Sequence, residues 1–194
     1  LGDRYFQDGN TSLAVTTWKR ILTTISPRAR ALSALGDVYL EHDMADEALV
    51  ALREAVQLDP QHLPSTKQLA GALERPQDRG AARQIWQELS EKARQTGDKL
   101  LARETRTHIV ALLSMEHLLE SQIPLWQSQF AAQKPDIEAG RTLAEAQIHL
   151  RKLADAEATL RRVIQLAPGD ADSYLALERV LVQGNKLQDA IAVL

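Results

Sequence analysis

Cysteine is absent from this 194-residue chain, so it can form no disulfide bond, thiol nucleophile or thiolate-bound metal site. Aromatic residues make up only 4%, and glycine and proline are few. No apolar run approaches the roughly 20 residues of a membrane-spanning helix, and no signal peptide is visible. We therefore expect a soluble protein, cytoplasmic or periplasmic, with the compartment left open. The chain lacks an initiator Met, which suggests a processed or excised piece.

What remains is rich in Ala, Leu, Gln, Glu and Arg, all of which favour helices. This composition predicts an all-α fold. The net charge is −3, and both signs are mixed along the chain. The densest basic run, between Arg103 and Arg106, is interrupted by Glu104. Nucleic-acid-binding proteins usually carry a clustered basic surface, so we expect no nucleic-acid partner.

A short motif recurs at a fixed distance. The chain opens with LGDRY at residues 1–5, and LGDVY follows at residues 35–39, a separation of 34 residues. In both copies an alanine stands twelve residues after the glycine. The same twelve-residue offset joins two alanines in later parts of the chain. The matching pairs are Gly2 and Ala14, Gly36 and Ala48, Ala70 and Ala82, and Ala144 and Ala156.

This pattern resembles the tetratricopeptide repeat (TPR) family. Residues 29–62 match its 34-residue pattern at nearly every position, with Leu32, Leu35-Gly36, Tyr39, Ala48, Leu52, Ala55 and Pro60. The resemblance implies an all-α TPR α-solenoid, in which stacked antiparallel helix hairpins form a right-handed superhelix. It extends over residues 1–194 as one array. The expected units are 1–28 (truncated), 29–62, 63–96, 103–136 (irregular), 137–170 and 171–194 (truncated).

The register breaks once, at an insertion of residues 97–102. Gly97 is expected to end one helix and Asp98 to cap the next, which we predict over about 98–116. In this fourth unit, Val110 and Gln122 replace the pair of small residues. We therefore expect its two helices to lie further apart. The insertion has two interpretations, a tolerated change in superhelix pitch or a wider groove that serves a partner.

Small residues at repeat positions 8 and 20 are expected to face each other, so that the two helices of a hairpin pack closely. Position 24 is expected to hold a large residue that fills the space between repeats. Trp18, Trp86 and Trp126 all stand at that position. We interpret these tryptophans as core residues rather than as a stacking surface for a ligand.

No arrangement of residues indicates catalysis. The five histidines are scattered, HExxH is absent, and so are phosphate-binding glycine motifs. We expect no catalytic residue, no cofactor and no metal site, and we do not expect an enzyme.

In the TPR family, positions 2, 5, 9, 12 and 13 line the concave groove, mostly from the first helix of each hairpin. This resemblance places a mixture of charged and apolar side chains in the groove. The candidate partner-binding residues are Asp3, Phe6, Arg30, Asp37, Leu40, Glu41, Lys67, Glu74, Arg75, Met115, Arg141, Glu145, Ile148, His149 and Arg179.

The resemblance implies a protein–protein interaction scaffold that holds a peptide or protein in its groove, within a multiprotein assembly such as bacterial secretion or envelope assembly. A helper domain of a larger enzyme or signalling protein is the alternative. RNA binding fits less well, because the groove lacks basic residues with stacking aromatics. Family members that clamp a C-terminal carboxylate use Asn at position 9, which here is never Asn. If the groove takes an acidic segment, replacing Lys67, Arg75 and Arg141 by Glu should abolish capture.

Both ends of the array lack a polar capping helix, which repeat arrays normally carry. Either a longer protein continues the array, or the open ends pack against other molecules. Self-association through the terminal repeats is therefore a hypothesis.

Overall fold

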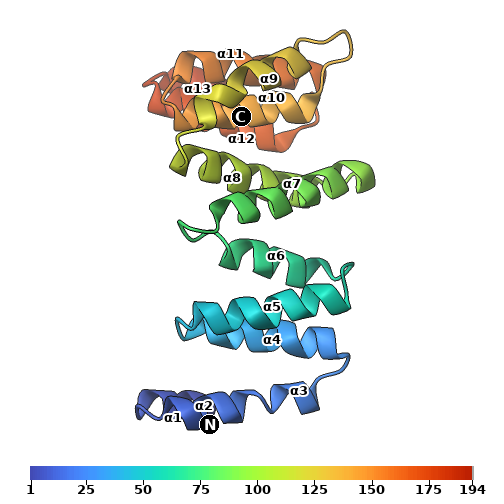
Figure 1. Ribbon diagram of the computed structural model, residues 1–194. Helices are drawn as coiled ribbons and strands as arrows, with labels where there is room; N and C mark the ends of the chain where they lie inside the picture. The colour runs from blue at the N-terminus through green and yellow to red at the C-terminus, as the bar shows by residue number, and fades with distance from the viewer. Residues whose placement is uncertain (194) are drawn as a thin grey trace. The chain divides into compact units, whose positions relative to one another are not determined.

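The computed structural model describes residues 1–193, and all the regular secondary structure in that range is helical. The chain divides into two compact units, Leu1–Glu88 (unit 1) and Leu89–Leu194 (unit 2). The helices are labelled in Figure 1.

Unit 1 begins with α1 (Gly2–Gln7), α2 (Thr11–Trp18) and the short α3 (Ile21–Thr24). It continues with α4 (Arg28–Glu41), α5 (Ala45–Leu58) and α6 (Leu63–Ala72). Helix α7 (Arg79–Thr96) contains the boundary between the units.

Unit 2 continues with α8 (Lys99–Met115), α9 (Leu119–Phe130) and α10 (Ile137–His149). It also contains α11 (Leu153–Leu166), α12 (Ala171–Gln183) and α13 (Leu187–Val193). Gly97 lies between α7 and α8 with a φ of +69°, as expected for a residue that ends a helix. The Asp98 side chain accepts a hydrogen bond from the Leu101 backbone amide at 3.0 Å, which confirms the predicted cap.

Helices α4 and α5 of unit 1 form a closely packed hairpin. Gly36 on α4 is buried, and a Cβ atom built on it would lie 2.7 Å from Leu52 Cγ on α5. Ala48 and Leu52 are both completely buried. The glycine therefore makes room for Leu52, and the gain in packing offsets its poor helix propensity.

The first hairpin repeats this arrangement with a larger side chain. A Cβ on Gly2 would lie 2.3 Å from Trp18 Nε1. In both hairpins the atoms nearest to the glycine belong to position 24, four residues beyond the alanine that we expected to face it. The expected partner at position 20 is thus only part of the contact, because the large side chain at position 24 reaches back over the glycine.

Within unit 2, the fourth repeat (residues 103–136) departs from this pattern. Helices α8 and α9 touch at few positions, whereas α9 packs extensively on α10 (Figure 1). This agrees with the expected separation of the helices that carry Val110 and Gln122. Gly140 on α10 is the counterpart of Gly36 here, since a Cβ on it would lie 2.6 Å from Phe130 Cε2. The ring of Phe130 thus fixes α9 against α10.

The exposure of Trp126 differs from the expectation that all three tryptophans are core residues. Trp18 and Trp86 are buried at 6% and 2% exposure, but Trp126 is only half-buried. Its helix α9 is displaced from α8, so the site at position 24 is not enclosed as it is in the other hairpins.

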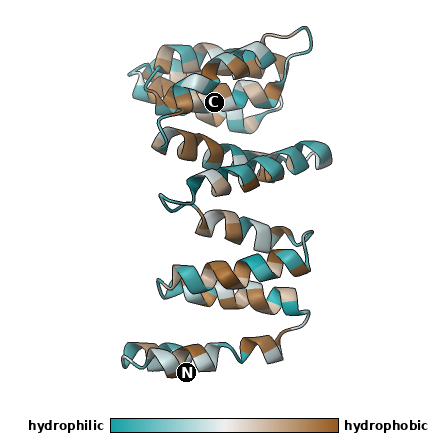
Figure 2. Cartoon of the chain, viewed as in Figure 1, coloured by the Kyte–Doolittle hydropathy of each residue, from teal (hydrophilic) through white to brown (hydrophobic). Residues whose placement is uncertain are grey.

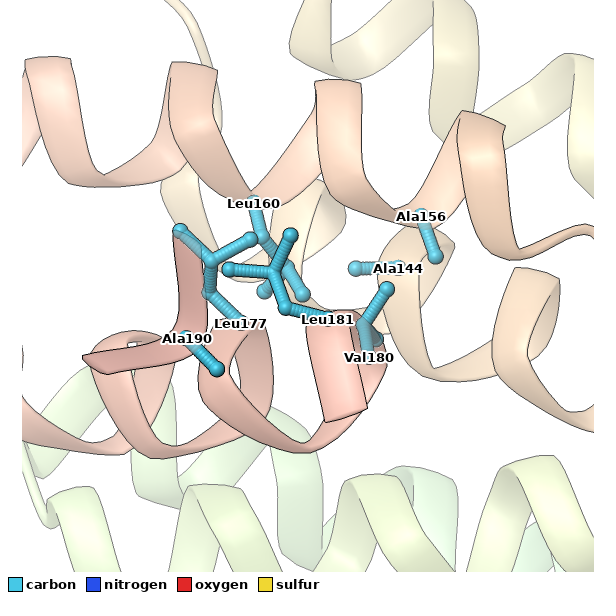
Figure 3. Close-up of a cluster of buried hydrophobic side chains, with 7 residues drawn as sticks. All are labelled: Ala144, Ala156, Leu160, Leu177, Val180, Leu181 and Ala190. Carbon is cyan, nitrogen blue, oxygen red and sulfur yellow. The ribbon is translucent and has the colours of Figure 1, made fainter. Parts of the chain in front are cut away.

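One buried cluster of unit 2 is formed by aliphatic side chains from four consecutive helices, α10 to α13. Figure 3 shows these side chains converging between the helices: Ala144, Ala156, Leu160, Leu177, Val180, Leu181 and Ala190. Figure 2 shows hydrophobic residues interleaved with hydrophilic ones along the helices, as amphipathic helices require.

Candidate functional site

Unit 2 contains a cavity of about 900 Å³, which we call the unit 2 groove. Its walls come mainly from α8, α10 and α12, the first helices of three successive hairpins. Leu160 of α11 contributes to its floor, together with Ala144 and Val180. A volume of this size accommodates several side chains of a bound segment.

Guanidinium–carboxylate pairs cross-link the helices that form the groove. Arg106 on α8 bonds to Glu138 and to Glu145 on α10, the latter at 2.8 Å. Arg141 joins Glu138 to Asp170, with distances of 2.9 Å and 2.8 Å. Arg106 is the most buried member, with 10% of its side chain exposed. These pairs fix the spacing between α8 and α10.

These bonds also shift the pKa values of two of the paired residues, Asp170 and Arg141. Burial alone would raise the pKa of Asp170, but hydrogen bonds from Ser173 and Arg141 outweigh it and hold that pKa below its usual value. Burial likewise disfavours the charge of Arg141, yet bonds to Glu138 and Asp170 raise its pKa. Asp170 and Arg141 are therefore both charged at neutral pH.

Another ion pair joins α8 to α12. Arg103 bonds to Asp172 at 3.1 Å, and both side chains are substantially exposed. Exposed leucines flank the pair, Leu100 on α8 and Leu175 on α12. The groove therefore offers apolar and charged surface side by side.

Five of the residues predicted for the groove line this cavity: Arg141, Glu145, Ile148, His149 and Arg179. The side chain of Met115, predicted on α8, is exposed but does not line it. Sequence reasoning missed Arg106, because it occupies position 4, where a bulky packing residue was expected. It also omitted Asp172 and Leu175, although these stand at positions 2 and 5 and the same rule would have found them.

Most of the charged residues predicted for unit 1 bond to other side chains of that unit. Arg75 pairs with Asp46 at 2.7 Å and with Asp78 at 2.8 Å. The carboxylate of Glu74 accepts the Trp86 indole N–H at 2.8 Å. Lys67 is half-buried with a bonding partner of its own, whereas Arg30 and Glu41 are exposed.

Asp37 has a neutral partner. The Gln68 side chain donates to both carboxylate oxygens, at 2.7 Å and 2.6 Å, and accepts from the Ser33 hydroxyl. Burial raises the pKa of Asp37, and the bonds from Gln68 only partly oppose this. The nearby predicted residue Leu40 is half-buried against the core of the first two hairpins.

Asp3 and Phe6 belong to a polar and aromatic cluster. Asp3 accepts the Trp18 indole N–H at 2.9 Å and lies 3.1 Å from His42 Nε2. The bonds from Trp18 and then His42 lower the pKa of Asp3. The His42 ring stacks on Trp18 with centroids 4.5 Å apart, and Phe6 lies 4.7 Å from the same ring. These two predicted residues thus contribute to joining α1 and α2 to the end of α4.

Within residues 1–193, no helix is long and apolar enough to span a membrane. The same residues include no group of three or more His, Cys, Asp or Glu side chains that could hold a metal ion.

Comparison with known families identifies the repeat. Residues 29–62, which are α4 and α5 with their flanking turns, match the model of the tetratricopeptide repeat family. The chain contains a tetratricopeptide repeat. No protein with a curated description matches the chain.

A solved structure with a TM-score above 0.5 extends the likeness to the TPR fold beyond this repeat. A tetratricopeptide repeat protein from Parabacteroides merdae is 13% identical over 99% of this chain and 74% of its own, with a TM-score of 0.52. TTC0263, a TPR protein from Thermus thermophilus, is 18% identical over 93% and 95% of the two chains, with a TM-score of 0.44. YrrB, described as a TPR protein with an unusual peptide-binding site, is 14% identical over 91% and 88%, with a TM-score of 0.47. The fold is thus an all-α solenoid of the TPR type. TPR folds are generally non-catalytic scaffolds for protein–protein interaction.

Proposed function

We propose that this chain is a scaffold that holds an extended segment of a partner protein in the unit 2 groove. The observation that carries the proposal is the cavity itself, which is lined by the first helices of three hairpins and includes five residues chosen from the repeat pattern. The cross-linking ion pairs support it, because a groove with fixed walls loses little entropy when a partner binds.

The groove also has the mixed character of a peptide-binding surface. Leu175 is 53% exposed and Ile148 is half-buried, so aliphatic side chains of a partner have apolar surface to cover. Arg179 and His149 are exposed beside them. Apolar contacts supply most of the free energy of binding, while polar groups fix orientation and register.

A capture experiment with matched variants tests the proposal. The chain is used as bait in a lysate of its source organism, beside Leu175→Glu and Leu58→Glu variants. Leu58 is 54% exposed, as Leu175 is, but lies at the end of α5 and outside the groove. A partner held in the groove should be captured by the wild type and by Leu58→Glu, and lost from Leu175→Glu.

Equal capture by all three proteins would remove the groove from the proposal. The identity of the captured protein then decides between an assembly for secretion, one for the envelope, and a larger enzyme. Light scattering across a concentration series tests the self-association hypothesis separately, since a strict monomer would end it.

A further inference from the structure

We propose that the partner segment carries a Lys or Arg beside an aliphatic side chain, and that Glu178 and Leu175 on α12 receive this pair. The inference rests on the proposed function and names the chemistry of the bound segment. Leu175 and Glu178 are three residues apart on α12, so their side chains lie on the same side of the helix. Both line the groove.

The charges that line the groove are balanced, so its preference for one sign of ligand depends on which of them are already paired. Four guanidinium groups line it, on Arg103, Arg106, Arg141 and Arg179. Four carboxylates also line it, on Glu104, Glu145, Asp172 and Glu178, and Glu138 and Asp170 bond to its arginines.

The arginines are poorly available to an acidic ligand. Arg106 and Arg141 each bond to two carboxylates, and Arg103 bonds to Asp172. An acidic segment would have to displace these partners, which leaves partly buried carboxylates unpaired at a cost in free energy. An acidic segment, the case that replacing Lys67, Arg75 and Arg141 by Glu would test, is therefore the less favoured ligand.

Glu178 is the carboxylate best placed for a new partner. It makes no hydrogen bond or ion pair with any residue between 1 and 193. Its side chain is half-buried, whereas Arg179 is exposed. A cation bound at Glu178 is consequently less screened by solvent than an anion bound at Arg179. The exposed Leu175 offers the aliphatic contact one turn away.

Three fluorescein-labelled peptides test the charge of the ligand. Each is a twelve-residue Gly-Ser peptide with a central Leu-X-Leu-X element, in which X is Lys, Glu or Gln. Fluorescence anisotropy measures their binding to the full chain at low and moderate salt. We expect the Lys peptide to bind more tightly than the Gln peptide, and the Glu peptide to bind most weakly.

Two charge variants test whether the Lys peptide binds at α12. Glu178→Gln should weaken binding of the Lys peptide by about two- to five-fold, the range expected for one partly exposed ion pair. Asp155→Asn makes the same change in charge at an exposed position of α11 outside the groove, and should leave binding unchanged. Circular dichroism confirms that both variants are folded.

The outcomes separate the two proposals. Tighter binding of the Glu peptide, or equal weakening by Asp155→Asn, would overturn the preference for a basic segment but leave the groove as a binding site. If an uncharged variant, Leu175→Asn, also binds the Lys peptide as the wild type does and captures the same partner, the proposed function fails as well.

Discussion

The α4–α5 hairpin of unit 1 and the α8–α9 pair of unit 2 hold corresponding positions of the 34-residue repeat, but their packing differs. In the first, Gly36 admits Leu52, and the two helices contact each other along their length. In the second, Val110 and Gln122 replace the small pair, and α9 packs on α10 instead. Of these two pairs, the one that closes is the one in which a small residue lets a large one reach across the helices.

The same contrast extends to the polar residues. In unit 1, the carboxylate of Asp37 meets the neutral amide of Gln68, and burial raises its pKa. In unit 2, the carboxylate of Asp170 meets the guanidinium of Arg141, and its pKa is lowered despite burial. The partly buried carboxylate of unit 1 thus has a neutral partner, whereas that of unit 2 belongs to an ion pair.

The largest expected effect is at position 24. Leu52→Ala removes a completely buried side chain and should lower the free energy of unfolding by about 2–5 kcal/mol. Trp126→Ala removes a larger side chain at the equivalent position, but one that is half-buried. We expect it to cost less than Leu52→Ala, about 1–2 kcal/mol. Urea denaturation followed by circular dichroism measures both values, and a larger loss from Trp126→Ala would contradict the comparison.

The next largest loss of stability is expected from the removal of Arg106. Arg106→Met keeps most of the side-chain volume but leaves Glu138 and Glu145 with fewer bonds in a partly buried site. We expect a loss of about 2 kcal/mol at neutral pH and low salt. The exposed pair of Arg28 and Glu54 supplies the control, since Arg28→Met should change stability by less than about 1 kcal/mol. Equal losses of stability would show that the ion pairs of the groove contribute no more than an exposed pair does.

Two glycines give a sharper test of the packing. Gly36→Ala places a Cβ 2.7 Å from Leu52 Cγ and should destabilise the chain by about 1 kcal/mol, after its gain in helix propensity is counted. Gly71, on α6, has open space around the same position. Gly71→Ala should therefore stabilise the chain by about 0.5–1 kcal/mol. Thermal unfolding of the two variants should shift in opposite directions, and a shared sign would refute the steric argument.

The smallest effects concern pH. Because the pKa of Asp170 is lowered on folding, its contribution to stability is complete at neutral pH and is lost as the pH falls through that lowered value, below about 4. The pKa of Asp37 is raised, so its carboxylate opposes folding once the pH rises above about 4. Asp170→Asn should therefore destabilise at pH 7 and have less effect at pH 3. Asp37→Asn should stabilise slightly at pH 7, by less than about 1 kcal/mol, as measured by unfolding at both pH values.

The repeat pattern predicted much of the fold because each hairpin is a local structure. The motif around Gly36, the cap at Asp98 and the turn at Gly97 all depend on residues close together in sequence. The candidate site was harder to predict. The repeat rule located Arg141, Glu145, Ile148, His149 and Arg179, since their positions follow from helical periodicity. It could not identify Arg106 as a groove residue, because that depends on carboxylates 32 and 39 residues away.

Sequence by itself determined that the chain is helical and that residues 29–62 form a TPR hairpin, because helix propensity and short-range periodicity are written in neighbouring residues. Tertiary structure alone decided that α9 packs on α10, and that three of the groove's arginines are already paired. Both depend on which side chains meet across hairpins, and contacts between distant residues are governed by packing volume and charge rather than by local preference.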